Sequence, residues 1–210
     1  MNKIGSTIVA IIFGLAATSV ATAQEAITSP HQLIDDSAEL ILSTIEGQKR
    51  IHGDTVNIEM VQALMKVLEP VIDFRSIASA VIGNYSNGVS TDQAEQFERV
   101  FKTTMVRLYL ESFMAFEVAE IEVQKPDADF SADSGRATVR MIASATNNTT
   151  YQINYSMRTD DANNWKVRNV VVDGINLGLT YRNQFDGAMN RYDGDVDQVI
   201  LNWDEDAVVE

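Results

Sequence analysis

Along the first half of the chain, apolar residues recur every three or four positions, which is the spacing of an amphipathic helix. The clearest stripe consists of Ile34, Ala38, Ile41 and Ile45. A proline after the second such segment and a capping box that begins at Ser90 help to divide this half into helices. Residues 84–89 are expected to form a loop. The predicted helices span residues 30–50, 55–69, 73–83 and 90–114.

After residue 117 the apolar period changes to two, which indicates β-strands. Hairpin-connected strands that follow helices predict an α+β fold: N-terminal helices packed on a twisted antiparallel sheet of about four strands. Two further helices are expected over about residues 179–190 and 196–203. The strands are predicted over residues 117–125, 136–145, 151–158 and 165–173.

The face of the sheet that is expected to point inward mixes large and small side chains. Tyr151 and Met157 belong to a bulky row, and Ala137, Ala143 and Ala145 belong to its neighbour. Such a mixture can leave an apolar cleft, or it can interdigitate in an ordinary core. The pattern leaves both arrangements open.

The first 23 residues have the three parts of a secretory signal peptide: a basic start at Lys3, an apolar run over residues 8–17, and small residues at Ala21 and Ala23. The run is shorter than the roughly 20 residues that span a bilayer. We therefore expect an exported, periplasmic protein. The predicted division is a signal peptide at 1–23, an α+β domain at 24–192, and an acidic C-terminal helix and tail at 193–210.

Composition removes several classes of function. The 210 residues include no cysteine, and 16 Lys and Arg against 30 Asp and Glu give a net charge of −14. Nucleic-acid binding is disfavoured because phosphate contacts need a basic surface. Without cysteine there is no thiolate nucleophile and no zinc–thiolate site. Neither His31 nor His52 lies in a metal-binding motif, and both are expected on the surface. We expect no catalytic residue, metal or cofactor.

Acidic residues 193–197 resemble the start of a calcium loop, but Gln198 and Asp204 stand where that loop needs glycine and glutamate.

Arginines in the sheet region, and one beyond it, are ambiguous. Arg140, Arg158 and Arg182 could be solvated, which their spacing favours, or could face an anionic headgroup.

Two segments carry more specific signatures: VIDFRSIASAVIGNY at residues 71–85 and WKVRNVVVDGINLGLTYRNQF at residues 165–185. They resemble DFxxIAxxVLGxYW and WKVYDVxxEGISLxxNYRxQF of the MlaC (toluene-tolerance) family. The order of elements is also similar over essentially the whole mature chain. The sequence departs from the family pattern at Ser86, where an aromatic residue is usual, and at Arg168-Asn169, which replace Tyr-Asp.

The resemblance implies a periplasmic carrier that shuttles glycerophospholipid between an outer-membrane lipoprotein–porin complex and an inner-membrane ABC transporter, maintaining outer-membrane lipid asymmetry. It also implies a deep apolar cleft between sheet and helices, with the headgroup near solvent. We expect a monomer, with Arg140, Arg158 and Arg182 as the headgroup or mouth residues. The predicted lining consists of Phe74, Ile77, Val81, Tyr85, Met105, Tyr109, Val139, Met141, Ile153, Tyr155, Ile175, Leu177 and Tyr181.

Other classes of function remain as alternatives. A small enzyme on a similar cone-shaped fold would need a titratable group such as Asp or His in the pocket, and the inward rows offer none. A periplasmic module for another apolar ligand, or an interaction module with a filled core, would share the elements. Since the sequence has no compact basic cluster, weak discrimination between phosphatidylethanolamine and phosphatidylglycerol is expected.

Overall fold

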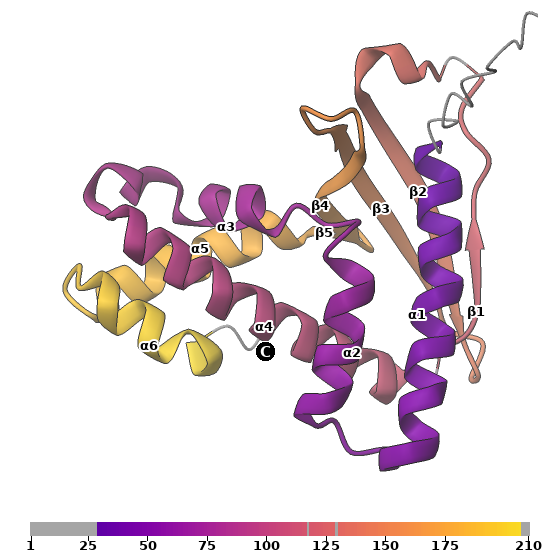
Figure 1. Ribbon diagram of the computed structural model, residues 1–210, viewed down its shortest axis with the longest axis horizontal. Helices are drawn as coiled ribbons and strands as arrows, with labels where there is room; N and C mark the ends of the chain where they lie inside the picture. Colours follow the sequence, from indigo (N-terminus) through magenta and orange to yellow (C-terminus); the bar gives the residue numbers. More distant parts are fainter. Residues whose placement is uncertain (1–28, 117, 129, 207–210) are drawn as a thin grey trace, which may run out of the picture.

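The computed structural model describes residues 29–116, 118–128 and 130–206, so the predicted signal peptide lies outside the described residues. A sheet with one helix along its face stands beside a group of helices (Figure 1). In chain order the elements are α1 (Pro30–His52), α2 (Ile58–Leu68), α3 (Phe74–Ile82), η1 (Gly83–Gly88), α4 (Thr91–Phe116), β1 (Val118–Val123), η2 (Ala132–Ser134), β2 (Arg136–Ala145), β3 (Thr150–Thr159), β4 (Trp165–Val172), β5 (Ile175–Asn176), α5 (Leu177–Arg191) and α6 (Val196–Asp206).

Local capping interactions set the helix starts, as the sequence predicts. The backbone N–H of Ser90 donates to Gln93 Oε1 at 3.0 Å, and the N–H of Gln93 donates to Ser90 Oγ at 3.2 Å. At the start of α3, Asp73 Oδ1 accepts from the N–H of Ser76 at 2.9 Å. These side chains satisfy N–H groups that have no partner within the helix. The segment 84–89 is mostly a 3₁₀ turn, η1, and not a loop.

The sheet has five antiparallel strands in the order β1-β2-β3-β4-β5, whereas the sequence predicts about four. The additional strand is β5, in which Ile175 pairs with Val172. Asp173 and Gly174, with φ of 48° and 85°, make the reversal between them. Positive φ at both central residues is the requirement of a type I′ hairpin, and Asp-Gly is its usual sequence. A strand of two residues is too short to show alternation.

Register places one apolar row across all five strands, because directly opposed residues point to the same face. This inner row consists of Val123, Met141, Ile153, Val172 and Ile175. A parallel row contains Val139, Tyr155 and Val170.

The buried apolar residues form three clusters. The first joins α3, α4, α5 and α6, with Phe97 and Trp203 edge to face at 4.9 Å between ring centroids. The second joins α1, α2, α3 and α4, and the third joins α1 to the inner face of the sheet around Val139 and Met157. The acidic C-terminal segment thus contributes the buried side of α6 to the first cluster. Among the described residues, no helix has the length and apolar character needed to cross a membrane.

Candidate functional site: an apolar hollow between sheet and helices

Part of the inner face of the sheet is left without a close-packed cover. Helix α1 buries one end of this face, and α3 and α5 also contact strands, whereas α4 packs mainly on α2, α3 and α6. Tyr151, Ile153, Tyr155, Val170 and Val172 remain only half-buried. Ile153, Tyr155 and Val170 pack against the third cluster and still keep accessible surface, so this part of the inner face is the candidate for an apolar hollow.

Exposure increases along the inner row from β2 to β5, and Val123 at the β1 end is half-buried. Met141 is 4% exposed, Ile153 and Val172 are half-buried, and Ile175 in β5 is 58% exposed. Leu179, in the first turn of α5, is 55% exposed. The apolar surface is therefore closed beneath α1 and open at β5 and the start of α5.

Two tyrosines mark the interior of this hollow. Burial raises the pKa of Tyr109, on α4, to about 12, although 37% of the residue is exposed. The exposed part of Tyr109 shows that its ring borders open space. Burial also raises the pKa of Tyr155, on β3, and the nearby Tyr109 phenol raises it further. The Tyr155 hydroxyl donates to Met141 Sδ at 3.8 Å, which ties it to the inner row.

The predicted lining residues divide into three groups. Phe74, Val81, Val139 and Met141 are buried inside the three clusters. The predicted residues that keep accessible surface on the sheet or the helices are the candidates to line the hollow. Tyr85 lies at a separate cavity beside η1. The sequence missed Val170, Val172 and Leu179, although the run Val170–Val172 already has two inward positions. The predicted candidates are Ile77, Met105, Tyr109, Ile153, Tyr155, Ile175, Leu177 and Tyr181.

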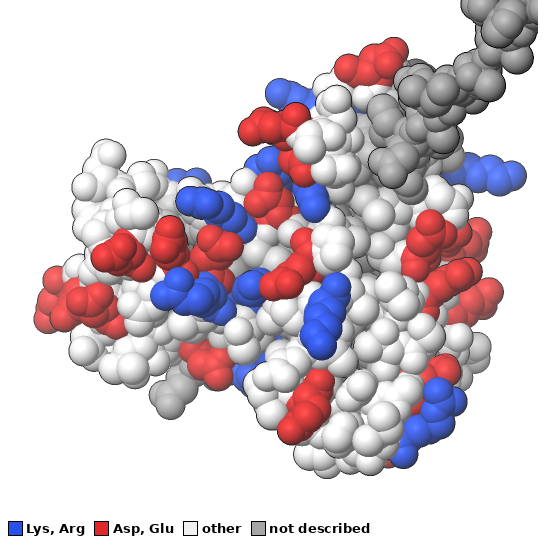
Figure 2. Space-filling view, in the orientation of Figure 1, with Lys and Arg blue, Asp and Glu red and all other residues white. Residues whose placement is uncertain are grey.

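The prediction that Arg140 and Arg158 border the mouth is wrong. Successive residues of a strand point to opposite faces of the sheet. Arg140 and Arg158 directly follow the inward residues Val139 and Met157, so both lie on the outer face. Arg140 forms an ion pair with Asp127 at 2.7 Å, which lowers the pKa of that carboxyl through a hydrogen bond. On the face drawn in Figure 2, basic side chains are interspersed with acidic ones.

Arg182 lies at a smaller cavity of about 190 Å³ between η1 and α5. Its Nη2 donates to Asn84 Oδ1 at 2.9 Å. The Tyr85 hydroxyl donates to Asp186 Oδ1 at 2.5 Å, and this hydrogen bond raises the pKa of Tyr85. The cavity is therefore lined by a cation and an anion, each with a neutral hydrogen-bond partner from η1.

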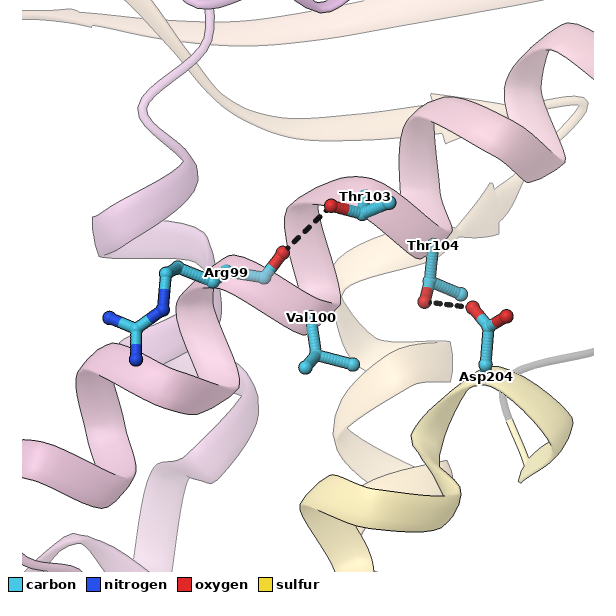
Figure 3. A pocket seen from close by; sticks show the side chains of 5 residues that line it. All are labelled: Arg99, Val100, Thr103, Thr104 and Asp204. Atoms are coloured by element: carbon cyan, nitrogen blue, oxygen red, sulfur yellow. Dashed lines mark hydrogen bonds between the residues drawn. The ribbon is translucent and has the colours of Figure 1, made fainter. Parts of the chain in front are cut away.

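A third recess lies between α4 and α6 (Figure 3). The Thr104 hydroxyl donates to the Asp204 carboxylate, and Arg107 Nη2 lies 3.2 Å from the same carboxylate. Thr104 and Arg107 on α4 are hydrogen-bonded or ion-paired to Asp204 on α6. These interactions hold α6 against α4 and leave the groups no need of a ligand.

His31 is half-buried and not on the surface as predicted. Its ring lies edge to face against Phe130 at 5.2 Å, because the segment after β1 crosses the start of α1. Burial lowers the pKa of this imidazole. His52 is exposed. In the described ranges, no group of three or more His, Asp or Glu side chains is arranged to hold a metal ion.

The two signature segments lie against each other beside the hollow. Val71 accepts a backbone hydrogen bond from Val167 at 2.8 Å, and Asp73 donates one to Val167 at 3.0 Å. Arg168, which departs from the family pattern, forms an ion pair with Asp73 at 3.0 Å. The signatures thus fix the start of α3 to β4.

Residues 36–205 match the family model described as MlaC protein, a range that contains both signature segments. The chain belongs to the MlaC family. It is 30% identical over 176 residues to the toluene tolerance protein ttg2D of Pseudomonas putida, covering 83% of this chain and 80% of that protein. This confirms the resemblance on which the sequence prediction depends.

The fold of this MlaC family member is also that of a solved structure. A phospholipid-binding protein from Ralstonia solanacearum, solved in complex with a phospholipid, superposes with a TM-score of 0.72. The two chains are 23% identical, and the match covers 85% of this chain and 97% of the other. The α+β prediction is confirmed.

Proposed function

We propose that this chain is a phospholipid carrier of the periplasm, which holds the acyl chains of a glycerophospholipid in the hollow between sheet and helices. The observation that carries the proposal is the inner row, which is apolar from β1 to β5 and passes from buried at Met141 in β2 to exposed at Ile175 in β5. A close-packed core does not leave such a row half open. The Ralstonia protein of the same fold, solved with a phospholipid, supports this ligand class.

The energetics of transfer suit a site of this kind. Each methylene removed from water is worth about 0.8 kcal/mol, so some 30 acyl methylenes represent roughly 24 kcal/mol relative to water. A bilayer and an apolar hollow are both dry, so the difference between them is much smaller. A carrier therefore needs shape, apolar lining and an open end, and no reactive group.

The titratable groups at the hollow favour a carrier over an enzyme. Among the described residues assigned to the hollow, Tyr109, Tyr155 and Tyr181 carry phenols whose pKa is raised by burial. These groups stay protonated at neutral pH, whereas a general base needs a pKa near the working pH. We propose that the protein acts by moving lipid between an outer-membrane lipoprotein–porin complex and an inner-membrane ABC transporter, as the family resemblance implies.

Mass spectrometry of organic extracts tests the proposal. The mature chain, purified without detergent from a periplasmic extract, is expected to release diacyl glycerophospholipid in a near-integral ratio to protein. The delipidated protein should then regain lipid from labelled vesicles and deliver it to unlabelled ones. A protein that is lipid-free as purified and does not take up lipid from vesicles would contradict the proposal and favour an interaction module.

A further inference from the structure

The cavity between η1 and α5 holds opposite charges that do not neutralise each other. Arg182 and Asp186 are four residues apart on α5, a spacing at which such side chains usually pair. In the part of the chain that the structure describes, neither forms an ion pair. Both are exposed and both line the same cavity of about 190 Å³.

Neighbouring residues of η1 hold the two charges apart. Asn84 accepts a hydrogen bond from the Arg182 guanidinium, and the Tyr85 hydroxyl donates one to Asp186. Both partners are neutral, so each charge is oriented without being cancelled. Gly83 provides the space for the guanidinium, because a Cβ at this position would lie 2.8 Å from Arg182 Nε.

We propose that this cavity binds a small zwitterion of the phosphoethanolamine type, with its phosphate at Arg182 and its ammonium at Asp186. A guanidinium binds phosphate through paired N–H groups, and a carboxylate accepts charge-assisted hydrogen bonds from ammonium. The cavity is smaller than the roughly 300–1,000 Å³ typical of sites for drug-sized ligands, which suits a headgroup. Val81 and Ile82, both buried, form its apolar floor.

The zwitterion can be part of a lipid or free in solution. Arg182 lies three residues after Leu179, the exposed apolar residue in the first turn of α5, and this spacing puts the cation of the cavity one turn from the open end of the apolar surface. In its lipid form the inference rests on the proposed function and names phosphatidylethanolamine as the preferred cargo. This differs from the weak headgroup discrimination expected from the sequence, which does not show that η1 brings Asn84 and Tyr85 to α5.

The test uses delipidated mature protein and two soluble probes, glycerophosphoethanolamine and glycerophosphoglycerol. Backbone amide shifts of residues 83–88 and 182–186 report binding, and uptake from vesicles of equal phosphatidylethanolamine and phosphatidylglycerol content reports the lipid arm. Asp186→Asn removes the anion but keeps an acceptor for Tyr85. Arg182→Gln removes the cation. Glu95→Gln, at an exposed acid on α4, is the matched charge control.

The expected result is saturable binding of glycerophosphoethanolamine that Asp186→Asn weakens about tenfold, while the control binds as the wild type does. A phosphatidylethanolamine preference that the same variant abolishes identifies the lipid headgroup as the source. Binding of the soluble probe with equal uptake of both lipids identifies a free zwitterion. Absence of probe binding together with equal uptake of both lipids overturns the inference and leaves the carrier function standing. If the wild-type protein takes up no lipid at all, the carrier function is contradicted, while binding of the soluble probe at the cavity is still decided by the amide shifts.

Discussion

Ile175 is the residue at which the apolar surface of the hollow reaches solvent. It shares the inner row with Val172 and Ile153, and it is 58% exposed. An isolated exposed isoleucine is ordinary on a protein surface, but one that continues a buried row is positioned to contact cargo.

Replacing Ile175 with Glu should remove lipid and spare the fold. The carboxylate is hydrated in the empty protein, whereas lipid uptake would bury it against hydrocarbon, which costs several kcal/mol or forces protonation. Each 1.4 kcal/mol lost weakens binding about tenfold. Lipid extracted from the purified variant is the measurement, with Leu201→Glu, at a 74% exposed residue on α6, as the matched control. Wild-type lipid occupancy in the variant would contradict the placement of the mouth, and an unfolded protein would show that Ile175 belongs to the core.

Gly83 ends α3 with φ of 52° and leaves room for Arg182. Gly83→Ala should lower the free energy of unfolding by about 1 kcal/mol or more, because alanine is strained at positive φ and its Cβ collides with the guanidinium. Gly187→Ala, in the middle of α5 with open space around it, should raise stability by up to about 1 kcal/mol through helix propensity. Urea unfolding of the two variants measures both changes in the free energy of unfolding. Equal effects would indicate that Arg182 moves aside freely and that the positive φ carries no strain.

At the scale of elements, the periodicity of apolar residues in the sequence predicts most of the fold. The apolar stripe Ile34–Ile45 predicts which side of α1 is buried, and the alternation in β2 predicts which of its side chains face inward. Both predictions hold because these long segments repeat the apolar period several times. Periodicity does not predict β5 because two residues cannot show a period, although Asp173-Gly174 is a hairpin signal. The alternation in β3 places Arg158 on the outer face, so its charge alone does not indicate a position at the mouth.

Helix α6 lies in the acidic C-terminal segment, yet its buried side completes the first apolar cluster. Trp203 is fully buried and touches Phe97, Phe101 and Phe185. Trp203→Ala should cost about 3–5 kcal/mol of unfolding free energy, since it leaves a large cavity among aromatic rings. Leu201→Ala, on the exposed side of the same helix, should change stability by less than about 0.5 kcal/mol. Chemical denaturation measures both, and a small effect at Trp203 would show that α6 docks only loosely.

At the scale of the whole molecule, the hollow depends on pieces far apart in the sequence. The sequence identifies each wall, but the space between α4 and the sheet follows from how three clusters pack, and no local pattern encodes it. Tyr109 and Tyr155 report on that space because they reach it from opposite sides.

Alkaline pH should weaken the folded state through these tyrosines. Burial raises the pKa of Tyr109 to about 12 in the folded protein, against 10.0 for the free side chain. Between these values the folded chain binds more protons than the unfolded chain, so stability is complete below pH 10 and falls as the pH rises toward 12. Absorbance titration of phenolate should show late-ionising tyrosines, and Tyr109→Phe and Tyr155→Phe should each remove one. Uniform ionisation near pH 10 in the folded protein would contradict a dry hollow.

The gap among the three clusters also has a consequence for the lifetime of the protein. A ligand that binds only the folded chain stabilises it by RT ln(1 + [L]/Kd), which is about 2.7 kcal/mol at a hundredfold excess over Kd. Acyl chains in the hollow would stand in for the side chains that a continuous core would have supplied. The empty form then opens more often and is the form that a protease meets. Cargo supply would thus set how long each molecule survives, and a cell short of lipid to move would also keep fewer molecules to move it.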